Sequence, residues 1–447
     1  MNNLRNIYFL GIGGIGMSAL ARYFHARDVK VRGYDLTESD LTLQLQQEGI
    51  QVFYQSDENR IDEKIDLVIY TPAIPEDHPE LLKALKLKLP VKKRSEVLGE
   101  LTREKKTIAV GGTHGKTTIS SIIAHLLKSN GIKVSAFVGG IMKNFNSNYL
   151  DEEGAEYMVV EADEFDRSFL QLHPEIAVVS SVDADHLDIY KEKYGLEQAF
   201  GLFIKNIKTG GALIMKYGLP LQRTTSIQTY TYGNNKEATY RFLHKEEKGE
   251  FLYSFSGLDM EIRNLSLRVP GWHNAENALA AAIAGQLCGL KDEEIKKGLE
   301  SWKGVKRRFD IRVHNKNNIY IDDYAHHPNE IKACLQAVGK MFPGRKITGI
   351  FQPHLYSRTR DFMDEFAKSL ELLDELYLLD IYPAREKPIE GVDSEKLFNK
   401  IKLEKKHLCK KEEMPERIRH KKPELLLTIG AGDIDRLVEP LEKILKE

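Results

Sequence analysis

The stretch GGTHGKTT, residues 111–118, combines residue types that bind the phosphates of a nucleotide. Backbone N–H groups of a tight glycine-rich turn can wrap a phosphate chain, and the positive end of a following helix strengthens the attraction. Lys116 would reach the terminal phosphates, and Thr117 would offer its hydroxyl to magnesium. Only three residues separate Gly111 from Gly115, one fewer than in the common P-loop, which disfavours an ordinary P-loop NTPase.

A second glycine-rich loop, GIGGIG, follows the first expected strand. It matches G-x-G-x-x-G, and Asp35 closes the next expected strand, as in dinucleotide-binding folds. The pattern predicts a diphosphate at the N-terminus of the following helix, but a nicotinamide dinucleotide and a nucleotide-sugar diphosphate would use the same loop. Glycines needed only for close helix–strand packing remain the alternative. The glycines of the pattern are Gly11, Gly13 and Gly16, and Gly14 lies within the same loop.

Acidic side chains follow two further expected strands. VVEADEFD places Glu161 and Asp163 on one face of a strand end, and SVDADHLD places His186 among aspartates. Magnesium prefers hard oxygen ligands and needs only one or two carboxylates. Acidic surface loops and a hydrogen-bonded turn histidine are adequate alternatives for either segment alone, so the magnesium interpretation depends on the neighbouring Gly-Lys-Thr loop.

Basic side chains gather after two strands in the last third of the chain. DDYAHHP (322–328) and FQPHLYSRTRDF (351–362) contain His326, His354 and Arg358. A guanidinium group there could bind a substrate carboxylate through two parallel hydrogen bonds. A solvated basic turn is the alternative, and two such clusters at equivalent strand ends make it less attractive.

The order of these segments predicts an α/β fold. Short apolar runs end in glycine-rich or acidic turns and open helix-like segments, which is typical of β-α units on a parallel sheet. We expect domains at 1–100, 101–305 and 306–447, with a β-rich insertion at 216–268, a helix at 270–287 and a helical linker at 89–106.

Composition excludes several classes of function. The chain has 447 residues and a formal net charge of −1, which argues against general binding to nucleic acid or to an anionic membrane. No apolar run approaches the roughly 20 residues of a membrane helix. The cysteines fit neither a disulfide framework nor a zinc site, so we expect free thiols and a cytoplasmic protein. They are Cys288, Cys334 and Cys409.

The whole chain resembles the Mur ligase family of ATP-dependent, amide-forming enzymes in peptidoglycan synthesis. The resemblance rests on GIGGIGMSALA, GTHGKTT, EADEFDRSFL, DADHLD, PGWHNAENALAA, RRFD, DDYAHHP, FQPHLYSRTRDF, DIYPAREKPIEGVDS and GAGDI, in that order. It implies a Rossmann-like N-terminal domain, a central P-loop-type ATPase domain with a mostly parallel sheet, and a Rossmann-like C-terminal domain. It also implies Mg²⁺, a monomer or homodimer, and the substrates UDP-N-acetylmuramate, L-alanine and ATP.

The resemblance further implies roles for individual residues. The first glycine loop and Asp35 would bind the UDP-sugar, and Lys116, His186, Arg308 and His326 would serve catalysis, with His186 or His326 as the general base. His354 and Arg358 would bind the amino acid, and Thr117, Glu161 and His186 would serve magnesium. ATP would contact Gly112, Thr113, His114, Gly115, Lys116, Thr117, Thr118, Asn277 and Asp323, with Arg308 at the γ-phosphate.

Two positions depart from the family pattern. Many members carry a carbamate-modified lysine downstream of the metal histidine, but this chain has Gly201, so we do not expect that modification. Alanine-adding members often have a second arginine where this chain has Leu355, so Arg358 would have to bind the alanine carboxylate without that second arginine.

Four other functions deserve comparison. A ligase that attaches a murein tripeptide to the same UDP-sugar is the nearest. Folylpolyglutamate synthetase would not need the N-terminal glycine loop. An NAD-dependent dehydrogenase would leave the Gly-Lys-Thr loop without a use, and a non-catalytic nucleotide switch would explain only the middle of the chain.

Overall fold

The computed structural model describes residues 4–183, 193–222, 227–247, 250–269, 271–384 and 386–447. The fold is α/β with mostly parallel sheets, as predicted. The chain divides into two compact units. Unit 1 comprises Met1–Arg268 and Ala275–Lys303, and unit 2 comprises Val269–Asn274 and Gly304–Glu447.

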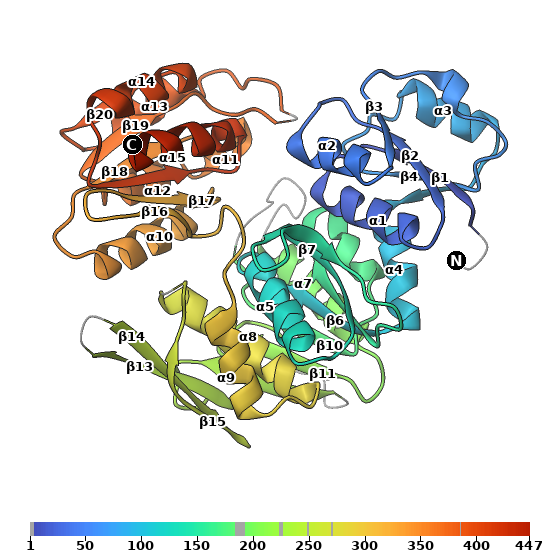
Figure 1. Cartoon of the computed structure of the whole chain (residues 1–447), viewed down its shortest axis with the longest axis horizontal. Helices are drawn as coiled ribbons and strands as arrows, with labels where there is room; N and C mark the ends of the chain where they lie inside the picture. The colour runs from blue at the N-terminus through green and yellow to red at the C-terminus, as the bar shows by residue number, and fades with distance from the viewer. Residues whose placement is uncertain (1–3, 184–192, 223–226, 248–249, 270, 385) are drawn as a thin grey trace. The chain divides into compact units, whose positions relative to one another are not determined.

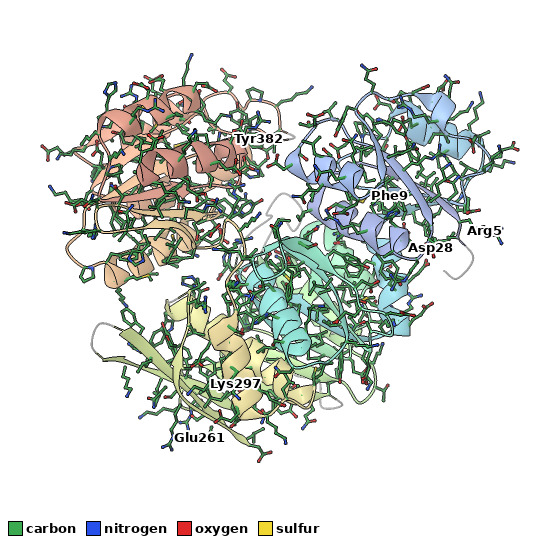
Figure 2. All side chains as sticks on the ribbon, viewed as in Figure 1. Arg5, Phe9, Asp28, Glu261, Lys297 and Tyr382 are labelled. Carbon is green, nitrogen blue, oxygen red and sulfur yellow. The ribbon has the colours of Figure 1, made fainter. Side chains whose placement is uncertain are left out.

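The first sheet of unit 1 is fully parallel, with the order β3-β2-β1-β4-β5 (blue in Figure 1). Its central strand, β1, is buried from Ile7 to Leu10, as is typical of a parallel strand covered by helices on both faces of the sheet. Phe9 in this strand is fully buried (Figure 2). The elements are β1 (Asn6–Leu10), α1 (Ile15–His25), β2 (Lys30–Tyr34), α2 (Asp40–Gln47), β3 (Gln51–Phe53), β4 (Leu67–Tyr70), α3 (Pro79–Lys86), β5 (Val91–Lys93) and α4 (Arg94–Glu104).

The second sheet of unit 1 has the order β15-β14-β13-β12-β11-β10-β6-β9-β7-β8. It is parallel from β13 to β7, and antiparallel strands lie at both ends. The strands are β6 (Lys106–Gly111), β7 (Val134–Met142), β8 (Ser147–Leu150), β9 (Tyr157–Ala162), β10 (Ile176–Val179), β11 (Ala212–Lys216), β12 (Gln228–Gly233), β13 (Tyr240–Glu247), β14 (Glu250–Gly257) and β15 (Met260–Ser266). The helices are α5 (Lys116–Ser129), α7 (Lys193–Lys205), α8 (Trp272–Leu287) and α9 (Asp292–Ser301).

The sheet of unit 2 has the order β16-β17-β21-β18-β19-β20, and only its β16–β17 pair is antiparallel. Its strands are β16 (Asp310–His314), β17 (Ile319–Asp323), β18 (Ile347–Phe351), β19 (Glu375–Leu378), β20 (Lys406–Leu408) and β21 (Leu425–Ile429). Its helices are α10 (Pro328–Met341), α11 (Tyr356–Asp361), α12 (Met363–Leu370), α13 (Ser394–Lys400), α14 (Met414–His420) and α15 (Val438–Lys446).

Several elements differ from the sequence-based expectation. The stretch predicted as a helical linker begins with β5, which pairs with β4, and becomes helical only from Arg94. Short edge strands such as β8 and β20 were not predicted, because three or four residues carry little periodicity. The β-rich insertion and the helix α8 were predicted correctly.

The three cysteines agree with the expectation from their spacing. All three cysteines are free thiols, and Cys334 and Cys409 are buried. Among the described residues, no helix is both long and apolar enough to cross a membrane.

Candidate active site

The Gly-Lys-Thr loop connects β6 to α5 in the middle of the second sheet, with β9 on one side and β10 on the other. Ligands in such sheets bind at the carboxyl ends of the strands, which is where this loop lies. Gly112 has φ +132° and Gly115 has φ +85°, conformations that side chains rarely adopt. A methyl group on Gly112 would also lie 2.2 Å from Ser180 Oγ. The glycines therefore allow the tight turn that phosphate binding requires.

Lys116, the first residue of α5, folds back over the loop. Its Nζ donates to Gly112 O at 2.8 Å and to Glu164 at 2.7 and 2.9 Å. Glu164 is fully buried. Burial alone would lower the pKa of Lys116, but Glu164 and the neighbouring carboxylates outweigh it and hold that pKa above its usual value. A charged ammonium group is thus fixed beside the loop. Glu164 belongs to the acidic segment VVEADEFD noted in the sequence, but its ion pair with Lys116 was not predicted.

Thr117 and Glu161 bring two hard oxygen donors together beside the loop. Thr117 Oγ1 donates to Glu161 Oε2 at 3.2 Å, and Gly139 N donates to Glu161 Oε1 at 2.5 Å. A hydroxyl and a carboxylate at this position fit a magnesium ion that keeps several waters. Within the described ranges, no cluster of three or more His, Cys, Asp or Glu side chains could hold a metal. The third expected ligand, His186, lies outside the described residues.

The segment after β10 braces the loop from the other side. Ser181 Oγ accepts from His114 N at 2.8 Å and contacts Thr113 Oγ1 at 2.9 Å, and Thr113 Oγ1 accepts from Asp183 N at 3.1 Å. The His114 and Asp183 side chains approach to 3.3 Å. These bonds tie the His114 backbone N–H and the Thr113 side chain to the segment after β10, so the loop conformation is set before any ligand binds. The sequence contained no signal for the role of Ser181.

Asn277, on α8, lies against the same loop. A methyl group on Gly115 would come within 2.6 Å of Asn277 Oδ1. The side-chain amide predicted to contact adenine is therefore brought directly to the loop. Thr118, the last loop residue expected to contact ATP, is buried in the first turn of α5.

The first glycine loop has the expected strand–loop–helix form. Gly11 has φ +82° and its N–H, like that of Ile12, donates to Tyr34 O. Gly13 N donates to Asp35 Oδ2 at 2.7 Å, so Asp35 fixes the loop itself. A methyl group on Gly16 would lie 2.8 Å from Arg94 Nη1. Arg94 thus places a cation at the first turn of α1, where a diphosphate would gain from it.

The paired arginines of KRRFD have different surroundings in unit 2. Arg307 serves the fold: its Nη2 donates to Gly430 O at 2.7 Å, and its Nε lies 3.6 Å from Asp322. The Arg308 guanidinium lies 4.7 Å from the ring centroid of Tyr324. Asp323 accepts from two backbone N–H groups, and burial raises its pKa to about 6. The contacts of Arg307 are thus with unit 2 itself, and Arg308 remains the arginine expected at the γ-phosphate.

His326 is held as a neutral imidazole. Burial lowers its pKa to about 4; Glu330 opposes the shift, and Arg358 adds to it. Its Nδ1 lies 3.0 Å from Tyr324 O. A carbonyl oxygen only accepts hydrogen bonds, so Nδ1 carries the proton and Nε2 is the acceptor.

His354 and Arg358 lie next to His326, as predicted from two separate strand ends. The His326 and His354 rings are 6.0 Å apart, and Arg358 Nη1 lies 3.3 Å from His354 Nδ1. His354 also stacks on Tyr382, which is labelled in Figure 2. Arg358 is buried. Unit 2 therefore gathers a buried guanidinium and two imidazoles at one sheet edge.

Together, the loop after β6, its lysine and its threonine define a nucleotide-binding domain of the P-loop class. Family models match almost the whole chain in consecutive segments. They describe the Mur ligase family catalytic domain (residues 6–106), the Mur ligase middle domain (110–285) and the Mur ligase glutamate ligase domain (307–432). The chain belongs to the Mur ligase family, whose members are ATP-dependent ligases.

Curated relatives agree with this membership. The chain is 45% identical to the UDP-N-acetylmuramate–L-alanine ligase of Parabacteroides distasonis, over 100% of this chain and 98% of that protein. It is also 45% identical to the enzyme of the same name from Cytophaga hutchinsonii, with the same coverage.

Solved structures extend the comparison. The UDP-N-acetylmuramate–alanine ligase of Thermotoga maritima matches with a TM-score of 0.84 and 30% identity, over 99% of each chain. A murein peptide ligase from Psychrobacter arcticus shares the fold, with a TM-score of 0.71 and 22% identity over 99% of this chain and 98% of the other.

Proposed function

We propose that this chain joins L-alanine to the lactyl carboxylate of UDP-N-acetylmuramate, with ATP as the energy source, in peptidoglycan precursor synthesis. The observation that supports this most strongly is full-length identity of 45% to enzymes of that name, combined with a complete Gly-Lys-Thr loop. The reaction would take place in the cytoplasm, where ATP and nucleotide sugars are available.

We assign the two glycine loops to different nucleotides. The first loop, with Arg94 beside the first turn of α1, would hold the diphosphate of the UDP-sugar. The second loop would hold the ATP phosphates, with Asn277 toward adenine. A dehydrogenase would use the first loop only, and a nucleotide switch the second only, so neither explains both. In the proposed division, residues 1–100 bind the UDP-sugar, residues 101–305 bind ATP, and residues 306–447 bind the amino acid.

The chemistry must turn a poor electrophile into a good one. Transfer of the γ-phosphoryl group to the lactyl carboxylate would give an acyl phosphate, and the amine of alanine would then displace phosphate to form the amide. Lys116 and Arg308 supply positive charge for the phosphoryl transfer, where electrostatic stabilisation and positioning dominate. Thr117, Glu161 and His186 would hold Mg²⁺, which when bound neutralises phosphate charge.

Lys116 is available for this role only after it exchanges partners. In the structure its ammonium group is bound by Glu164, and the incoming phosphates would compete for it. Glu164 therefore keeps a charged lysine ready at the loop without leaving either group unpaired in a buried place.

The histidine and arginine cluster of unit 2 suits the amino acid substrate. The buried Arg358 would bind the alanine carboxylate, and His354 orients it. His326, neutral with an acceptor at Nε2, would accept a hydrogen bond from the alanine ammonium group. Because its pKa is only about 4, His326 is a weak base, and orienting the amine suits it better than removing the proton.

The assignment is tested by mixing the protein with ATP, Mg²⁺ and UDP-N-acetylmuramate and offering L-alanine, L-serine, glycine or the murein tripeptide in turn. Phosphate release should depend on an amino acid and be most efficient with L-alanine. Efficient release with the tripeptide alone would favour the tripeptide ligase, and release with no amine dependence would reject amide formation.

A further inference from the structure

Asn148, in the short edge strand β8, binds helix α1, which packs on the first sheet, through both atoms of its side-chain amide. Its Nδ2 donates to Ile15 O at 2.6 Å and to Ser18 Oγ at 3.1 Å. Its Oδ1 accepts from Arg22 Nη1 at 2.6 Å. Asn148 and Ser18 are fully buried, and Arg22 is nearly so. Both amide hydrogens and the amide oxygen thus bind one helix.

These contacts fix α1 both along and around its axis. Residues 15, 18 and 22 lie on one face of the helix, at spacings of three and four residues. Ile15 is the first residue of α1, so Asn148 holds the turn whose N–H groups face the proposed diphosphate site. Arg22 is itself fixed by two hydrogen bonds to Glu48, at 2.7 and 2.9 Å. The amide is therefore anchored to a rigid partner.

The other end of this connection reaches the proposed magnesium ligand. Strand β8 pairs with β7, with Tyr149 opposite Phe137. Two residues beyond Phe137, Gly139 N donates to Glu161, which in turn accepts from Thr117. The path from the first turn of α1 to the ATP loop thus runs through two paired strands and direct hydrogen bonds.

We propose that Asn148 is a positioning residue for the reaction: it sets the register of the helix that holds the UDP-sugar diphosphate against the hairpin that holds Glu161. The inference rests on the proposed assignment of the two glycine loops. Its physical basis is that phosphoryl transfer depends steeply on the placement of the carboxylate relative to ATP, whereas each substrate alone binds within one loop.

A matched control lies at the other end of the same interface. Arg27, just after α1, donates to Asp151 at 2.6 Å and lies 3.6 Å from the Tyr23 ring centroid. Arg27→Ala removes a contact between the same two segments but does not touch the first turn of the helix.

The test measures kcat, KM for ATP, binding of UDP-N-acetylmuramate alone, binding of ADP alone, and Tm for the full-length protein and its variants. Asn148→Ala should lower kcat by on the order of ten- to a hundredfold while both single-ligand affinities stay within about twofold. Arg27→Ala should keep kcat within about twofold. Asn148→Asp, which keeps an acceptor for Arg22 but has no proton to donate to Ile15 O at neutral pH, should also lose kcat.

Three outcomes would overturn the inference. Equal kcat values in Asn148→Ala and Arg27→Ala would show that the contact of Asn148 with the first turn of α1 has no particular effect on turnover. If the loss of UDP-sugar affinity in Asn148→Ala explained the whole loss of turnover, Asn148 would only stabilise the first glycine loop and would not position the two substrates relative to each other. Absence of L-alanine-dependent turnover in the unchanged protein would reject the proposed function, and the inference with it.

Discussion

The ammonium group of Lys116 lies 2.7 Å from the buried carboxylate of Glu164. The two side chains come from different elements, α5 and the segment after β9, and their contact joins the ATP loop to the acidic strand end. With the role proposed for Lys116 in phosphoryl transfer, this ion pair would link stability and catalysis at one position.

Lys116→Ala should abolish turnover because the cation for phosphoryl transfer is lost, while UDP-sugar binding at the first loop stays nearly intact. It should also lower the free energy of unfolding by about 3–5 kcal/mol, since the buried Glu164 loses the cation that neutralises its charge. Chemical denaturation and calorimetric titration measure the two effects. The double variant Lys116→Ala/Glu164→Gln should recover much of the stability but no turnover. Loss of UDP-sugar binding in a folded variant would contradict the division between the loops.

Gly139→Ala should raise the Mg²⁺ concentration needed for half-maximal activity. The added methyl group would lie 2.7 Å from Glu161 Oε2, so the carboxylate must shift from its present position beside Thr117. Gly201→Ala is the control, because nothing lies within 4 Å of its added methyl group and Ala suits the helix α7. A Mg²⁺ titration of the rate measures both. An unchanged Mg²⁺ requirement in a folded Gly139→Ala protein would argue against Glu161 as a ligand.

Arg358→Lys should raise KM for L-alanine by about tenfold or more, because a lysine cannot form the two parallel hydrogen bonds of a guanidinium group with a carboxylate. KM for ATP and for the UDP-sugar should change little. The exposed Arg360 pairs with Asp361, and Arg360→Lys should have no effect. Steady-state kinetics with each substrate varied in turn give the three KM values. An equal rise in all of them would indicate a general distortion of the site and would contradict a specific role of Arg358 in binding L-alanine.

His326 should stay neutral to well below pH 6. Its pKa is about 4 in the folded chain and about 6.5 when unfolded, so acid protonates the unfolded chain first. The resulting stability is fully present above about pH 6.5 and is lost as the pH falls toward 4. NMR of histidine-labelled protein should show an imidazole signal that keeps its shifts from pH 8 to 5.5 and is missing from His326→Asn; the buried His125, whose pKa is also lowered to about 4, should give a second such signal that the variant retains. A resonance of His326 that titrates near pH 6.5 would contradict this assignment.

Local chemistry made much of this site predictable. The order strand, glycine loop, Lys and helix sufficed to place residues 111–118, and the strand ends of unit 2 sufficed to bring His326 near Arg358. Contacts between segments distant in sequence were not predictable. Neither the pairing of Glu164 with Lys116 nor the bonds from Asn148 to α1 leaves any periodicity or spacing to detect. The different surroundings of Arg307 and Arg308 likewise appear only once Asp322 and Gly430 are placed.

The proposed acyl phosphate is tested most directly by labelling the lactyl carboxylate oxygens. UDP-N-acetylmuramate labelled with ¹⁸O at both lactyl carboxylate positions is incubated with the protein, ATP, Mg²⁺ and L-alanine. Mass spectrometry then gives the ¹⁸O content of the phosphate and of the amide product. One ¹⁸O should appear in the released phosphate and one in the new UDP-sugar amide for each L-alanine joined. Phosphate without ¹⁸O, or phosphate released without the amide, would contradict the proposed mechanism.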